Sequence, residues 1–294
     1  PDATPANDLR QILEDHGCKG KTLGVEWEAY GLTARNGQRL SAALGGFCEL
    51  VDASELVSKL RVVKSPAEID YVRKAANLAD AAWDAAIDVA EPGVGEGSIL
   101  AAMNAAVFEG GGDYSANPSI IGSGRDALLC RYKSGRRILE PQDQLTLEWA
   151  GVYRHYHAAM MRTMCFGKPP ARQVELYDAS LEALEAVHAS IKPGNTFGQG
   201  FTAHADILDK RNLTQHRLNA CGYSLGTTYA PNWMDWPMLY ERNPVEFAPG
   251  MVIFTHMIIF DSDAEIAMSL GETVLVTETG NERLSQASRE FVVK

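Results

Sequence analysis

The hydrophobic positions in residues 1–61 predict two short helices and two short strands. Helical spacing covers 9–17 and 38–47, and strand-like segments cover 22–27 and 48–53. This stretch offers too few apolar residues to form an independent core. We interpret residues 1–61 as the C-terminal part of an α/β N-terminal domain, and we expect an upstream segment to be absent.

From about residue 62 the pattern changes to longer elements. Ser65 to Glu68 form a helix start, with Ser as N-cap, Pro at the first position and Glu at the third. Segments rich in β-branched and aromatic residues predict strands over 145–157, 251–260 and 272–278. We expect residues 62–294 to form one catalytic domain.

An internal repeat organises this second domain. Two segments, beginning at Asp80 and Leu181, both contain a helix, a Pro-Gly pair, a Gly and then a second helix. Pro141 lies seven residues before Glu148, and Pro249 lies seven residues before His256. The repeat predicts a pseudo-twofold α+β domain in which Glu148 and His256 occupy equivalent strand positions facing one another. Chance similarity between two Ala-rich helices is the alternative.

Charge and cysteine content narrow the function. The net charge is −11 and no Lys/Arg cluster is present, which disfavours nucleic acids and anionic membranes as partners. No apolar run reaches the length needed to cross a bilayer. The five dispersed cysteines are typical of reduced thiols, so we expect a cytoplasmic protein.

The ordered motifs of residues 62–294 resemble the pita-bread family of creatinase, prolidase, aminopeptidase P and methionine aminopeptidase. The similarity lies in RVVKSPAEIDYVRKAA, LTLEWAGVYRHYHAAMMRT, CGYSLG, FAPGMVIFTHM and SLGETVLVTE. The resemblance implies a pita-bread fold and, in the metallopeptidases, five ligands to two divalent ions. The positions that match those ligands are Glu148, Ala159, Tyr223, His256 and Gly271. We therefore expect no metal and no cofactor, since a two-metal site needs carboxylates from several strands. A single metal held by His155 and His157 with Glu148 or His256 is the alternative.

Within the family, the run from Glu148 to His157 most resembles the branch of ectoine hydrolases, which open a cyclic amidine to an N-acetylated diaminobutyrate. The resemblance implies a metal-independent hydrolase that acts on a C–N bond of a small polar metabolite. The candidate catalytic residues are Glu148, His256, Tyr223 and His157. The candidate substrate-binding residues are Arg131, Arg154, Tyr156, Tyr229, Trp233 and Glu272.

Each candidate has a chemical reason and a structural alternative. A carboxylate in the middle of a strand, such as Glu148, is costly unless it has a partner or a task. Glu148 could attack carbon or activate water, or it could only anchor Arg154 or Arg162. His256 could shuttle a proton or be a core residue, and Tyr223 could stabilise an oxyanion or fill space. The aromatic and arginine side chains suit a zwitterion, and Glu272 suits the cationic amidine, although aromatic residues on strands are more often core.

Other functions remain open at the level of sequence. They are a dipeptidase or sulfoniopropionate lyase with an altered metal site, a creatinase-like amidinohydrolase, and a non-catalytic pseudo-peptidase that binds partners. Retained polar residues at Glu148 and His256 favour an enzyme. By resemblance to the family we also expect a homodimer in which residues 1–61 contribute beside the partner's site.

Overall fold

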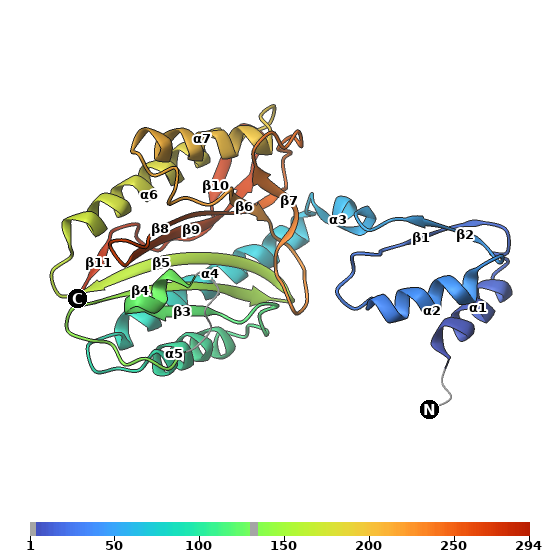
Figure 1. The fold of residues 1–294 in the computed structure, drawn as a ribbon, viewed down its shortest axis with the longest axis horizontal. Coiled ribbons are helices and arrows are strands. Elements are labelled where there is room, and N and C mark those ends of the chain that lie inside the picture. Colours follow the sequence, from blue (N-terminus) through green and yellow to red (C-terminus); the bar gives the residue numbers. More distant parts are fainter. Residues whose placement is uncertain (1–3, 130–134) are drawn as a thin grey trace. The chain divides into compact units, whose positions relative to one another are not determined.

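The computed structural model describes residues 4–129 and 135–294. The chain divides into two compact units, Pro1–Arg61 and Val62–Lys294 (Figure 1). The first unit contains α1 (Pro5–Asp15), β1 (Thr22–Val25), α2 (Ala34–Leu44), β2 (Glu49–Asp52) and α3 (Leu56–Arg61). Its two strands are parallel, and its buried apolar side chains are few: Val25, Leu44 and Phe47. The order of helices and strands predicted for this unit is confirmed.

The second unit begins with two helices, α4 (Pro66–Val89) and α5 (Glu96–Glu109). The predicted helix start is present as a capping box, because Ser65 Oγ accepts from the Glu68 backbone N–H while the Glu68 carboxylate accepts from Ser65 N. The first half of the sheet follows: β3 (Ile120–Ser123), the short 3₁₀ helix η1 (Gly124–Leu128), β4 (Asp143–Tyr153) and β5 (Tyr156–Phe166).

One predicted strand, 145–157, is wrong because it is interrupted by a turn. Arg154 and His155 connect β4 to β5 with positive φ angles of 51° and 61°. Two consecutive residues with positive φ are typical of the tight type I′ connection between antiparallel strands. His155 therefore lies in the turn and not on the strand that carries His157.

The second half repeats the first. It comprises α6 (Ala171–Ser190), α7 (Phe197–Lys210), β6 (Ala220–Ser224), β7 (Asp235–Tyr240), β8 (Val252–Asp261) and β9 (Ile266–Val276), followed by β10 (Asn281–Arg283) and β11 (Val292–Val293). The strand order is β3-β4-β5-β9-β8-β6-β7, so the two halves meet where β5 lies beside β9 (Figure 1). The predicted pseudo-twofold α+β architecture is confirmed.

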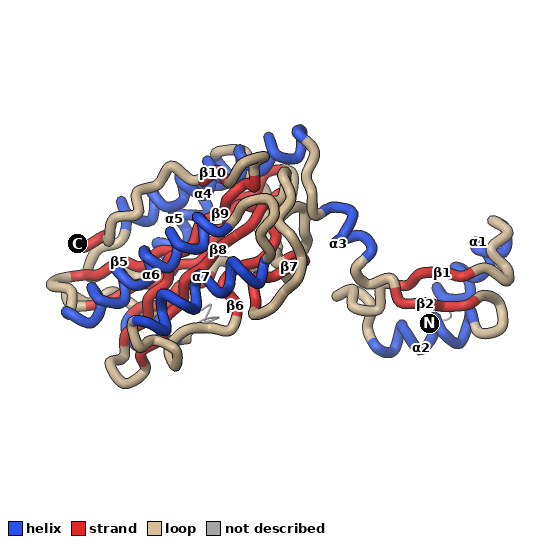
Figure 2. The backbone as a smooth tube through the Cα atoms, turned by 90° about the horizontal axis from the view of Figure 1, so that it is seen from above, coloured by secondary structure: helices blue, strands red, loops and turns tan. Residues whose placement is uncertain are grey.

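All four long helices cover one face of the sheet. Trp149 on β4 donates its indole N–H to Ala79 of α4 at 2.9 Å. Met257 and Leu270 on β8 and β9 pack in the core formed with α6 and α7, which lie along these strands (Figure 2). Strand register places all three side chains on the same face. Gly151 permits the close approach of α4, because a Cβ there would lie 2.0 Å from Ala75 O.

Within the described residues, no helix combines the length and apolar character needed to span a bilayer.

Candidate active site

Four paired positions form a row across the face of the sheet opposite the helices. Glu148 pairs with Met161, Met161 with Gly271, and Gly271 with His256. Directly opposed residues of antiparallel strands point to the same face, so the Glu148 and His256 side chains share this face. The row connects the two halves of the repeat at the positions that the sequence predicted to be equivalent.

Tyr223, on the neighbouring strand β6, contacts both polar members of the row with its side chain. It pairs with Phe254 on β8, two residues before His256, so its ring is on the same face. The Tyr223 hydroxyl donates to Glu148 Oε1 at 3.5 Å, and the centroid of its ring lies 5.6 Å from that of His256. Glu148, Tyr223 and His256 are therefore brought together in one site.

Trp233 fixes the direction of the Tyr223 hydroxyl. The Trp233 indole Nε1–H donates to Tyr223 Oη at 2.8 Å. Indole can only donate, so Tyr223 uses a lone pair for Trp233 and keeps its own proton for an acceptor on the Glu148 side. Of the candidate substrate-binding residues in the described structure, Trp233 is the one that contacts Tyr223.

The surroundings of the site are dry. Glu148 and His256 are each 7 % exposed, and Tyr223 is 3 % exposed. A cavity of about 20 Å³ adjoins Glu148, which is room for little more than one water molecule. Among the residues lining it are Met161, Ile258 and Phe260. In such surroundings a hydrogen bond or a charge acts more strongly than it does in water.

The residues of this face do not fit a pair of divalent ions. A Cβ at Gly271 would lie 2.9 Å from Phe254 Cζ and 2.9 Å from Thr255 O, so the ring of Phe254 fills the space a carboxylate at position 271 would need. Ala159 supplies only its backbone carbonyl, which accepts from Thr273 Oγ1 at 2.8 Å. Within 4–129 and 135–294 no group of three or more His, Cys, Asp or Glu side chains could hold a metal ion.

His157 lies on the same face but is occupied by the protein. Its Nε2 accepts from the Ala116 backbone N–H at 3.0 Å, which leaves the ring proton on Nδ1, near Gly226 O at 3.4 Å and Thr228 Oγ1 at 3.5 Å. Burial lowers its pKa to about 4. The two ring nitrogens of His157 thus connect two loops, and the catalytic role expected for His157 stays a prediction.

Arg154 and His155 form the tip of the β4–β5 hairpin, and Tyr229 from the segment between β6 and β7 packs against this tip. Arg154 is exposed in the turn, and His155 packs on Tyr229 with ring centroids 4.7 Å apart. Tyr229 itself is 66 % exposed. The structure therefore does not bring Arg154 or Tyr229 into the row. The alternative of a single metal held by His155 and His157 on one strand face is wrong, because His155 belongs to the turn.

Tyr156 lies on the helix face, contrary to its expected role. Its hydroxyl donates to Glu68 Oε1 of α4 at 2.7 Å, and its ring packs on Tyr71. Burial and the hydrogen bond to the Glu68 carboxylate raise its pKa to about 12. Tyr156 directly precedes His157 on β5. Successive strand residues point to opposite faces, so the two side chains lie on opposite faces of the sheet.

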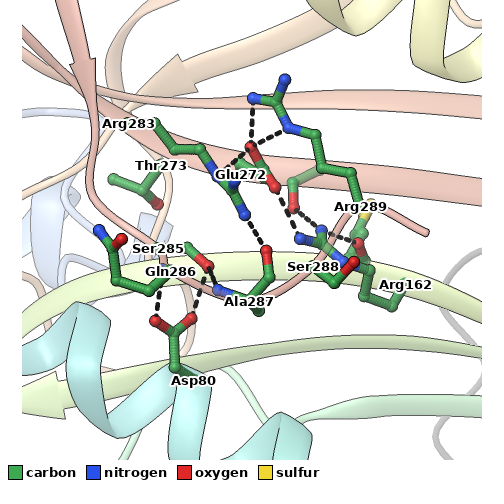
Figure 3. A network of polar contacts seen from close by, with 12 residues as sticks. Asp80, Arg162, Glu272, Thr273, Arg283, Ser285, Gln286, Ala287, Ser288 and Arg289 are labelled. Carbon is green, nitrogen blue, oxygen red and sulfur yellow. Dashed lines mark hydrogen bonds and ion pairs between the residues drawn. The ribbon is translucent and has the colours of Figure 1, made fainter.

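Glu272 also faces the helices, where arginines surround it (Figure 3). Its Oε1 lies 2.6 Å from Arg162 Nη2, and its Oε2 lies 2.6 Å from Arg289 Nη2 and 3.0 Å from Arg283 Nε. Burial alone would raise the pKa of Glu272, but the hydrogen bond from Arg289 and the three positive charges lower it. This placement corrects the expectation that Glu272 binds a cationic substrate. Arg131, the remaining candidate, lies outside the described residues.

Two residues of the site were missed in the sequence. Phe254 fills the space beside Gly271, and its spacing of two from His256 on β8 would have placed it on the same face. His188 on α6 lies behind the row, with Nε2 2.9 Å from Thr255 Oγ1, and no short spacing connects it to β8.

Comparisons with known proteins identify the family and the fold. The model of metallopeptidase family M24 matches residues 70–278. The ectoine hydrolase of Halomonas elongata is 30 % identical over 305 residues, covering 100 % of this chain and 75 % of that protein. The Xaa-Pro dipeptidase of Pyrococcus furiosus is 26 % identical over 244 residues, covering 83 % and 69 %. The solved Xaa-Pro dipeptidase from Bacillus anthracis superposes with a TM-score of 0.89 at 23 % identity, covering 100 % and 80 %.

The fold and these relatives define a hydrolase with the pita-bread fold. The chain belongs to metallopeptidase family M24. The family and fold expected from the sequence motifs are thereby confirmed.

Proposed function

We propose that this protein hydrolyses a C–N bond of a small polar metabolite without a metal, and that ectoine is its substrate. The product would be the N-acetylated diaminobutyrate formed by opening the cyclic amidine. One observation carries the proposal: Glu148, Tyr223 and His256 meet on a buried face where Phe254 fills the space beside Gly271. The full-length similarity to an ectoine hydrolase supports the choice of substrate.

The reaction needs one water molecule and two proton movements. Glu148 either attacks the amidine carbon itself or takes a proton from water, whose oxygen then bonds to that carbon. One C–N bond of the tetrahedral intermediate breaks, and its electron pair stays on the leaving nitrogen. His256 is placed across the site to supply a proton to that nitrogen. If Glu148 attacks, loss of this nitrogen leaves an imidoyl ester on Glu148; water then adds to its carbon, and the C–O bond to Glu148 breaks to release the amide product and the free carboxylate.

We assign Tyr223 and the aromatic rings to stabilising the developing charge and to binding the cationic substrate. The proton of Tyr223 points away from Trp233, so it can donate to the oxygen that develops at the amidine carbon. The cavity beside Glu148 holds little more than one water molecule, so ectoine can bind only if side chains that line the cavity move. Once admitted, a compact cation could contact the rings of Tyr223, Trp233 or Phe254, and such contacts are worth roughly 2 kcal/mol when water is excluded.

A metal-dependent dipeptidase is the competing function, because Xaa-Pro dipeptidases are among the relatives. The test is to incubate purified protein with ectoine, creatine and an Xaa-Pro dipeptide, each with and without EDTA, and to follow products by mass spectrometry. We expect ectoine to be opened at the same rate with and without EDTA. Dipeptide cleavage that EDTA abolishes, with ectoine untouched, would contradict the proposal.

We further propose a cytoplasmic homodimer. The proposal rests on the family and on the free thiols of Cys18, Cys48, Cys165 and Cys221. Light scattering coupled to size-exclusion chromatography should give about twice the chain mass of 32.0 kDa.

A further inference from the structure

A buried carboxylate outside the row holds both ends of one segment. Glu96, the first residue of α5, is 0 % exposed. Its Oε1 accepts from Ser123 N at 2.8 Å and from Ser123 Oγ at 2.7 Å. Its Oε2 accepts from the backbone N–H groups of Arg136 at 3.0 Å and Arg137 at 3.1 Å. A buried charge is costly without such donors, and within the described residues these four come from Ser123 at the end of β3 and from Arg136 and Arg137 ahead of β4.

The described part of this connection reaches the candidate active site. After Ser123 the chain forms η1, and Ala127 and Leu129 line the small cavity beside Glu148. The turn is tight, because a Cβ at Gly122 would lie 2.8 Å from Asp126 O. A shift of Ser123 would therefore also move Ala127 and Leu129, which line the cavity beside Glu148.

A second anchor holds the same segment from the sheet side. Gln144 Nε2 donates to Gly124 O at 2.8 Å and to Glu265 O at 2.8 Å, while its Oε1 accepts from Ala267 N at 3.1 Å. Gln144 thus fixes Gly124 to the sheet, and Glu96 fixes the neighbouring Ser123 to α5. Arg136 and Arg137 at the other end have Glu96 as their common acceptor.

We infer that Glu96 is a positioning residue for the reaction: its carboxylate holds Ser123, and with it the segment whose Ala127 and Leu129 line the cavity beside Glu148. The inference rests on the proposed role of Glu148 in catalysis. Glu96 touches neither substrate nor the reacting atoms, and it acts through Ser123, Arg136 and Arg137.

The test compares Glu96→Gln with Glu109→Gln. An amide presents one acceptor oxygen and an NH₂ group, so Glu96→Gln loses acceptors for two of the four donors and sets donor against donor. Glu109 is exposed at the other end of α5 and serves as the matched control. We expect faster amide exchange in peptides covering 120–129 and 135–139, and faster carbodiimide labelling of Glu148 measured by mass spectrometry. Turnover of ectoine should fall about 10- to 100-fold at saturating substrate. Glu109→Gln should change none of these.

The three measurements separate the possible failures. Amide exchange and carbodiimide labelling do not depend on activity, so they test the positioning role of Glu96 even if the wild-type protein leaves ectoine unchanged. Unchanged ectoine would instead refute the proposed function. If amide exchange in Glu96→Gln is the same as in the wild type, the role of Glu96 is overturned. It is equally overturned if exchange becomes faster while the labelling of Glu148 and the turnover stay unchanged. If Glu96→Gln does not fold, Ser123→Ala removes one of the four donors and should shift the same readouts by a smaller amount.

Discussion

The proposed chemistry depends on the carboxylate of Glu148. Glu148→Gln keeps the size of the side chain and an acceptor for Tyr223 but removes the charge. We expect turnover to fall about 10²–10⁴-fold while substrate binding changes little, because the lost interaction matters mainly in the transition state. Steady-state kinetics and a melting curve on the same preparation check this. A folded variant with wild-type turnover would remove Glu148 from the mechanism.

Tyr223 and Trp233 should act as one unit. Trp233→Phe removes the N–H that orients the Tyr223 hydroxyl, and Tyr223→Phe removes the hydroxyl itself. Each change should lower turnover about tenfold, roughly the size of one hydrogen bond to a developing charge. The double variant should be little worse than either single one, since both remove the same donor. Additive losses in this double-mutant cycle would show that the two residues act separately.

For single residues, the sequence predicted which residues lie together better than it predicted which face of the sheet a side chain points to. The equal spacing from Pro141 to Glu148 and from Pro249 to His256 correctly paired two residues that share a face. Glu272 was expected in the site because it follows Gly271 directly. Neighbouring residues of a strand point to opposite faces, so Glu272 faces away from the row. Residue type gave no warning, since a glutamate suits either a substrate cation or three arginines.

At the scale of elements, the Glu272 network joins β9, β5 and the C-terminal segment. Glu272→Gln should destabilise the fold by about 3–5 kcal/mol, because it leaves the surrounding arginine charges buried and uncompensated. Glu185→Gln is the matched control: that carboxylate is 62 % exposed and lies 4.0 Å from Arg289. Urea denaturation of both variants checks the difference. Equal midpoints would mean that the arginines relax to solvent.

The same scale shows why one strand was mispredicted. Residues 145–157 have an unbroken β-forming composition, and neither Arg154 nor His155 is a usual turn residue. Both nevertheless adopt positive φ, because the pairing of β4 with β5 along eleven positions fixes where the hairpin must reverse. Tertiary pairing outweighs local preference here, and no local pattern reveals it.

For the whole molecule, buried histidines make stability depend on pH. Burial lowers the pKa of His157, His188 and His204 to about 4. Between pH 6.5 and about 4 the unfolded chain binds protons that the folded one does not, so stability falls as pH falls, by up to about 1.4 kcal/mol per pH unit for each histidine. Urea midpoints at pH 7.5 and 5.0 check this.

A matched pair of variants identifies the origin of that slope. His204→Gln should reduce the difference between the two midpoints, because it removes one of the three groups. His16→Gln should leave the difference unchanged, because His16 is exposed. An equal effect of both variants would assign the pH dependence to other groups.

The overall architecture was predictable because a repeat and ordered motifs extend over the whole domain. The periodic apolar pattern gave the helices, and duplication gave the symmetry of the sheet. The contacts of His188 and Glu96 were not predictable, since each joins segments far apart in the chain. The contacts of these two residues depend on burial, and no periodic pattern in the sequence indicates that a polar residue is buried.

The ring of Phe254 beside Gly271 also bears on the history open to this chain. A mutation that returned a carboxylate to position 271 would meet Phe254 Cζ and the Thr255 carbonyl before it met a metal. Phe254 in turn packs against Tyr223 and His256. A carboxylate at position 271 would thus need a second change that moves or shortens the side chain at position 254. Through this packing, the effect of a substitution at position 271 depends on the residue at position 254.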